Sequence, residues 1–137
     1  MEPYRYLLDT NIISALVRDP RGVVYQKLRD LQPAAVCTSI VVAAEIQYGL
    51  RKGVSKALRS NVEKVLCALD VLPLEQPVDE HYGEIRAHLQ KRGQPIGQND
   101  LFIAAHALAL GLTLVSDNVR EFSKVPKLKL ENWLAAA

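Results

Sequence analysis

The sequence lacks the features of membrane, disulfide-rich and zinc proteins. None of its apolar runs reaches the length of about 18 residues that a membrane helix needs, and the apolar segments near the start are too short for a secretory signal. Its two cysteines, Cys37 and Cys67, lie outside any CxxC or Cys/His cluster, which argues against zinc and against a disulfide framework. We therefore expect a soluble cytoplasmic protein whose cysteines are buried thiols.

Strong net charge, internal repeats, linkers and low-complexity tracts are also missing. The formal charge of +2 does not by itself indicate a nucleic-acid binder. The chain of 137 residues is 49% hydrophobic, which is enough for one domain with a continuous core. We expect this domain to span residues 1–134, and we exclude Ala135, Ala136 and Ala137 as a cloning scar or a disordered tail.

Short strands and helices alternate along the chain. Apolar runs predict strands over residues 4–8, 34–38, 71–74 and 112–115. Helical spacing, capping residues and breaks predict helices over residues 12–17, 20–31, 40–50, 54–69, 78–93 and 101–110, with Ser39 and Ser55 as N-caps and Gly111 as a terminator. This alternation predicts an α/β fold, a central and mostly parallel sheet flanked by helices.

Four acidic residues stand out by their positions. Asp9 and Asp117 directly follow predicted strands, where turn formation is the ordinary role of aspartate. Glu45 interrupts an apolar helix, and Asp100 lies in the first turn of another, where negative charge is favoured. Each has a simple structural explanation, but ligand sites of α/β sheets lie at the carboxyl ends of the strands. Together the four predict a site at that edge.

Such a cluster of carboxylates would favour a hard cation. Two carboxylates about 4 Å apart repel by roughly 4 kcal/mol at an effective dielectric of about 20, so the group would take up protons or bind metal. Oxygen ligands without His or Cys favour Mg²⁺ or Mn²⁺ over Zn²⁺. Such an ion can polarise a phosphodiester and activate water. His81, His88 and His106 show no ligand spacing, which disfavours a histidine-based mechanism.

Four short segments resemble those of a known family. They are LLDTNIIS at residues 7–14, AEIQYGL at 44–50, IGQNDLFIAAHALALG at 96–111 and LVSDNVREFSKVP at 114–126. In order and spacing the chain is similar, over essentially its whole length, to the PIN-domain nucleases, specifically the VapC toxins of toxin-antitoxin pairs. The resemblance implies a PIN-like fold and a metal-dependent endoribonuclease that inhibits translation by cleaving RNA, with the anticodon region of tRNA favoured over ribosomal RNA.

The resemblance also assigns roles to individual residues. It implies that Asp9, Asp100 and Asp117 hold Mg²⁺ or Mn²⁺ and that Glu45 does so directly or through water. Supporting polar positions are filled by Thr10, Asn11 and Ser116; many relatives have Thr where this chain has Ser116. An antitoxin and a second copy of the chain are the expected partners, and since no DNA-binding motif is present, contact with DNA would be indirect.

A negatively charged site repels the RNA backbone, so basic residues around it must position the substrate. A solvated surface charge is the ordinary role of each candidate. The candidates are Arg51, Lys52, Arg86, Arg92 and Arg120, with Lys56, Arg59 and Lys91 in addition.

Two other functions stay open at this point. Asp9 at a strand end could accept a phosphoryl group, as in receiver-like proteins, but no second Asp follows two residues later. Alternatively, the chain could keep the fold as an inactive RNA-binding or protein-binding module, because fold does not fix function.

Overall fold

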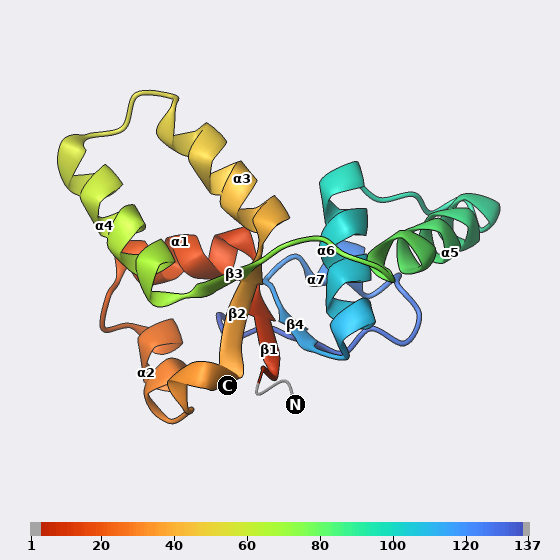
Figure 1. Ribbon diagram of the computed structural model, residues 1–137, viewed down its shortest axis with the longest axis horizontal. Coiled ribbons are helices and arrows are strands. Elements are labelled where there is room, and N and C mark those ends of the chain that lie inside the picture. The colour runs from red at the N-terminus through yellow and green to blue at the C-terminus, as the bar shows by residue number, and fades with distance from the viewer. Residues whose placement is uncertain (1–3, 136–137) are drawn as a thin grey trace.

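The computed structural model describes residues 4–135 (Figure 1). Its sheet has the order β3-β2-β1-β4-β5, and all neighbouring strands are parallel. This confirms the predicted α/β class. The strands in the described part of the chain are β1 (Tyr6–Leu8), β2 (Val36–Ser39), β3 (Asp70–Leu72), β4 (Thr113–Val115) and β5 (Leu130–Glu131).

Helices flank the sheet. Figure 1 shows α1, α2 and α4 on one side of the sheet and α5 and α6 on the other. A short 3₁₀ helix over Pro33–Ala35 leads into β2. The α-helices of the described chain are α1 (Thr10–Arg18), α2 (Val23–Arg29), α3 (Ile40–Leu50), α4 (Lys56–Ala68), α5 (Val78–Lys91), α6 (Gln98–Leu110) and α7 (Val119–Phe122).

The register of the central strands brings their carboxyl ends together. Leu8, the last residue of β1, pairs with Thr38 of β2 and Val115 of β4. The residues that follow β1 and β4, Asp9 and Ser116, therefore meet at one edge of the sheet. Leu7, Leu8 and Leu114 are fully buried, so packing in the apolar core holds the strands that end at this edge.

Three predicted helix ends are confirmed. The Ser39 hydroxyl accepts a hydrogen bond from the backbone N–H of Val41 (3.1 Å), and that of Ser55 accepts one from Leu58 (3.1 Å). Gly111 ends α6 with a φ of 68°, a left-handed conformation that glycine adopts without steric cost.

Other expectations need correction. The helix predicted over residues 101–110 begins earlier, at Gln98, and Asp100 lies in its first turn. Cys37 is buried, but Cys67 is exposed, because it lies about 140° around α4 from the buried Val62 and faces outward. Within residues 4–135, no helix is long and apolar enough to cross a membrane. The expected tail falls partly on residues 136 and 137, which lie outside the described residues.

Candidate active site

Asp9 occupies the turn between β1 and α1. Its backbone N–H continues the sheet by bonding to the Val115 carbonyl (2.9 Å). Its carboxylate caps α1, since Oδ1 accepts from the Thr10 N–H (2.8 Å), while Oδ2 accepts from the Ser116 hydroxyl (2.7 Å). Only 5% of Asp9 is exposed. Asp9 therefore acts as a helix cap, and its carboxylate is buried at the sheet edge.

Glu45 reaches this edge from α3. Its Oε1 accepts a hydrogen bond from the Thr10 hydroxyl (2.6 Å), and its Oε2 lies 3.5 Å from the amide nitrogen of Asn99, a long contact. Residues of α1, α3 and α6 thus meet around one carboxylate. Glu45 itself is half-buried.

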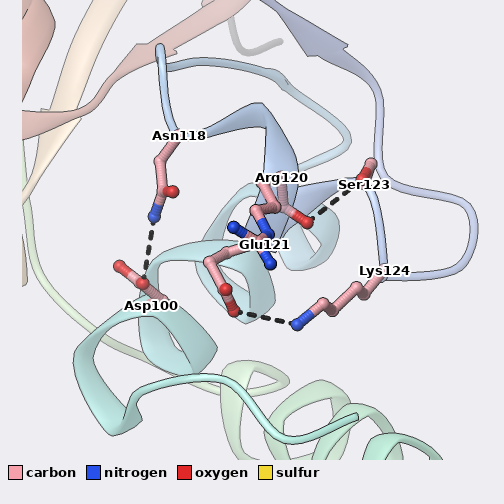
Figure 2. Close-up of polar contacts among 6 residues, drawn as sticks. All are labelled: Asp100, Asn118, Arg120, Glu121, Ser123 and Lys124. Carbon is pink, nitrogen blue, oxygen red and sulfur yellow. Dashed lines mark hydrogen bonds and ion pairs between the residues drawn. The ribbon is translucent and has the colours of Figure 1, made fainter.

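Asp100 faces Asn118 from the first turn of α6 (Figure 2). The amide nitrogen of Asn118 lies 3.4 Å from Asp100 Oδ2, and the backbone N–H of Asn118 donates to the Ser116 hydroxyl (3.0 Å). Ser116 therefore connects the segment after β4 both to Asp9 and, through Asn118, to Asp100.

Asp117 and Asn11 lie at the rim of the cluster. The backbone N–H of Asp117 donates to Asn11 Oδ1 (3.3 Å), and the Asp117 side chain is exposed. Its negative charge nevertheless acts on Asp9. The role of Asp117 as a metal ligand stays a prediction.

The electrostatics show that these acids share one field. Burial raises the pKa of Asp9, hydrogen bonds from Ser116 and Thr10 oppose this, and the charges of Glu45 and Asp117 raise it further. Burial also raises the pKa of Asp100 to about 6, with added repulsion from Asp9, Glu45 and Glu121. The cluster carries more negative charge than its surroundings balance, which a bound cation would relieve.

The donor set fits a hard divalent cation. All candidate ligands are oxygen atoms, as Mg²⁺ and Mn²⁺ prefer. Within residues 4–135, however, no three His, Cys, Asp or Glu side chains are already placed as a ligand set. Hydrogen bonds instead hold the carboxylates of Asp9, Glu45 and Asp100 individually. The residues fit the ion in type and charge, and the identity of its direct ligands stays a prediction.

Glu121, Asn118 and Asn99 were not singled out from the sequence. Glu121 follows Asp117 by four residues on the short helix α7, and its carboxylate binds Lys124 (3.2 Å; Figure 2). The spacing from Asp117 and the position of Asn99 beside Asp100 were the available signals. Neither signal could be interpreted without knowing where α6 and α7 lie relative to each other.

The basic candidates are spread over several elements. Arg51 and Lys52 follow the end of α3, Arg86 and Arg92 lie on and at the end of α5, and all four are exposed. Arg120 is exposed on α7, next to Glu121 in sequence. Lys56 and Lys91 are exposed, and Arg59 donates to the Leu50 carbonyl (3.2 Å). Roles in RNA positioning stay predictions.

His106 has a structural role. It is buried, and its Nδ1 lies 2.8 Å from the hydroxyl of Ser39, the N-cap of α3. Burial lowers its pKa, which keeps the imidazole neutral. His106 thus supports the helix that carries Glu45.

Comparison with known proteins gives the family context of the chain. A model of the PIN domain matches residues 6–128. Ribonuclease VapC2 of Rickettsia felis is 38% identical over 130 residues, covering 93% of this chain and 97% of that protein. The tRNA(fMet)-specific endonuclease VapC of Shigella flexneri is 33% identical over 130 residues, covering 94% and 98%.

A solved structure shares the fold along nearly the whole chain. The VapBC2 complex from Rickettsia felis, bound to a promoter DNA fragment, contains a chain that superposes with a TM-score of 0.87 at 37% identity. The match covers 93% of this chain and 98% of that one.

Proposed function

Because the chain belongs to the PIN-domain family and, within it, to the VapC ribonucleases, we propose that it is a Mg²⁺- or Mn²⁺-dependent endoribonuclease and the toxin of a type II toxin-antitoxin pair. The observation that carries the proposal is the convergence of Asp9, Glu45 and Asp100 from three separate elements at one edge of the sheet. Burial there, with added repulsion from Asp9 and Glu45, raises the pKa of Asp100 to about 6.

The chain's own residues supply binding and orientation. A divalent cation at this site would polarise the phosphodiester and lower the pKa of attacking water. Asp9, Glu45, Asp100 and Asp117 are the proposed ligands, directly or through water. Ser116 and Thr10 hold the carboxylates of Asp9 and Glu45 by their hydroxyl groups, so these oxygens are oriented before substrate binds. Hydrolysis would leave a 5′-phosphate and a 3′-hydroxyl.

The proposed substrate is tRNA, cut in the anticodon region, with inhibition of translation as the consequence. Support comes from two relatives at 33% and 31% identity that are named tRNA(fMet)-specific endonucleases. Other relatives are named only as ribonucleases, so ribosomal RNA is the alternative. The proposed site of action is the cytoplasm, where either RNA would be cut.

The proposed partners are a VapB-type antitoxin, a second copy of the chain and, only through the antitoxin, operator DNA. Similar solved structures are VapBC complexes, two of them bound to DNA. An apolar groove of about 490 Å³ between α1, α2 and α4 offers a surface for the antitoxin; Leu16, Tyr25, Leu28 and Val65 are among its lining residues.

The decisive experiment uses purified, antitoxin-free protein with total tRNA and, separately, ribosomal RNA. Each is incubated with Mg²⁺, with Mn²⁺ or with EDTA, beside the variants Asp9→Asn and Asp100→Asn, and cut ends are mapped. Discrete metal-dependent cuts that both variants lose support the proposal. No cutting by folded wild-type protein would favour the inactive binding module. In a separate experiment, trapping of an acylphosphate at Asp9 would favour the receiver-like alternative.

A further inference from the structure

A cavity of about 310 Å³ lies between α5 and α6, and no residue of the acidic cluster lines it. Its buried floor includes Leu89, Ile96 and Leu101, while Arg86, Gln90 and Gln98 supply polar groups at its walls. The volume falls within the range of small-molecule pockets. An apolar floor with a few polar groups at the walls is suited to a flat ring that carries hydrogen-bonding edges.

The wall on α5 is a row of three side chains. Tyr82, Arg86 and Gln90 are four residues apart and so lie on one face of the helix. The Tyr82 ring is stacked on Phe102, with centroids 4.4 Å apart, and the Tyr82 hydroxyl accepts a hydrogen bond from Arg86 Nη1 (3.0 Å). Among residues 4–135, the ion pairs found do not include Arg86. Its guanidinium is exposed, donates to the Tyr82 hydroxyl and has no acidic partner among these residues.

These groups together match the parts of a nucleotide. A planar guanidinium can stack on a base or bind a phosphate, and single-stranded RNA is commonly read in this way. The amides of Gln90 and Gln98 each offer a donor and an acceptor for the edge of a base. Arg86, Gln90 and Gln98 are exposed at the walls, so their hydrogen-bonding groups are available to such a ligand.

The cavity is also within reach of the acidic cluster. Gln98 is the first residue of α6, and Asp100 lies in the same turn. Residues two positions apart point to nearly opposite sides of a helix, so a strand passing from Asp100 to the cavity crosses a helix about 10 Å wide. No side chain caps this end of α6, which leaves backbone N–H groups that favour a crossing phosphate.

On the basis of the proposed ribonuclease function, we propose that the cavity between α5 and α6 binds one unpaired nucleobase of the RNA substrate, close to the cleaved bond, with Arg86, Gln90 and Gln98 as positioning residues. The cavity would then help to select the position of the cut.

The test is a double-mutant cycle in which a change in the protein is combined with a change in the RNA substrate. In an RNA that the wild-type protein cleaves, nucleotides flanking the cut are replaced one at a time by abasic residues. One replacement should raise KM about tenfold with little change in kcat. Arg86→Gln should raise KM on intact RNA similarly and should become insensitive to that one replacement. The matched control is Arg21→Gln, which changes an exposed arginine between α1 and α2.

A second measurement does not require cleavage. Adenosine, cytidine, guanosine and uridine 5′-monophosphates are titrated into isotope-labelled protein, with and without Arg86→Gln. Shifts of the Gln90 and Gln98 side-chain amide signals that the variant abolishes support the cavity, even if no RNA is cut and the ribonuclease proposal fails. The nucleobase site would be overturned by equal KM values for wild type and Arg86→Gln, or by additive losses at every abasic position. A change only in self-association would also overturn it, because it would indicate that the cavity is a contact between copies of the chain.

Discussion

At the scale of single residues, the Ser116 hydroxyl connects two acidic residues of the candidate site. It is fully buried, donates to Asp9 Oδ2 (2.7 Å) and accepts from the backbone N–H of Asn118 (3.0 Å). Asn118 in turn contacts Asp100. One hydroxyl group therefore fixes a buried carboxylate and the loop beside a second one.

Two replacements of Ser116 should distinguish the effect of its hydroxyl group from the effect of its side-chain size. Ser116→Ala removes a hydrogen bond to a charged group, so we expect a loss of about 1–2 kcal/mol in the free energy of unfolding and about a tenfold loss in RNA cleavage. The pKa of Asp9 should rise further, since the bond to Ser116 lowers it. Ser116→Thr should retain most activity. Urea unfolding and cleavage kinetics check this, and a fully active Ala variant would contradict it.

Asp100 predicts a pH dependence of the metal-free protein. Its folded-state pKa of about 6 exceeds its ordinary value of 3.8, so the folded state binds the proton more tightly than the unfolded chain. Without metal, stability should fall as pH rises from about 4 to about 6 and stay lower above that range. Asp100→Asn should abolish the contribution of Asp100 to this fall in stability. It should also stabilise the metal-free protein by about 1 kcal/mol at neutral pH, a value reduced because the Asp100 side chain is partly exposed.

Thermal unfolding in EDTA across this pH range measures the effect. The matched control is Glu84→Gln, which changes an exposed acid on α5 away from the cluster. An unchanged pH profile in Asp100→Asn would contradict the assignment. Added Mg²⁺ should stabilise the wild-type protein more than this variant, because the variant has lost a proposed ligand.

At the scale of elements, long periodic segments with capping residues were predictable and short ones were not. The bounds of α3 agree with the prediction because Ser39 caps the helix and its apolar run continues to Leu50. In contrast, β5 has two residues and α7 has four, too few for a hydrophobic period to emerge. Contacts between elements decide whether such short segments become regular.

The same distinction applies to the site. Asp9, Glu45 and Asp100 could be found because strand ends and apolar helices make a carboxylate conspicuous. Glu121 and Asn118 could not, since the charge of Glu121 and the amide of Asn118 act on Asp100 across segments separated by the whole of β4. Cys67 was misplaced because a small apolar residue in an amphipathic helix fits either face.

Two glycines should respond oppositely to the same change. Gly111→Ala places a Cβ on a backbone with a φ of 68°, and we expect it to destabilise the protein by about 1 kcal/mol. Gly83→Ala, in the exposed middle of α5, should stabilise it by about 0.5–1 kcal/mol. Neither added Cβ meets another atom within 4 Å. Urea unfolding of both variants measures this, and equal signs would contradict the backbone explanation.

At the scale of the whole molecule, the described part of the chain presents two different surfaces. The acidic cluster lies at the carboxyl edge of the sheet, whereas the apolar groove lies between α1, α2 and α4. α1 connects them, because Asp9 caps it and Leu16 and Val17 line the groove. An antitoxin bound in the groove would thus lie along the helix that starts at the site.

Groove and site should therefore be separable by mutation. Tyr25 lines the groove and is 41% exposed, so Tyr25→Glu should weaken antitoxin binding at least tenfold without unfolding the protein, and RNA cleavage should be unchanged. The matched control is Tyr48→Glu on α3, which alters a 66% exposed tyrosine outside the groove. Calorimetric titration with antitoxin checks this, and equal affinity in both variants would contradict the docking surface.

The position of β4 sets the time at which activity can appear during protein synthesis. β4 pairs with the inner strand β1, and Ser116, which follows it, bonds to Asp9 across 107 residues of sequence. A nascent chain that has released Asp9 and Glu45 from the ribosome, but not residue 116, still lacks the second neighbour of β1. The edge of the sheet that carries the acidic cluster is therefore completed only near the end of translation, and products truncated before β4 contain Asp9 and Glu45 without a completed edge.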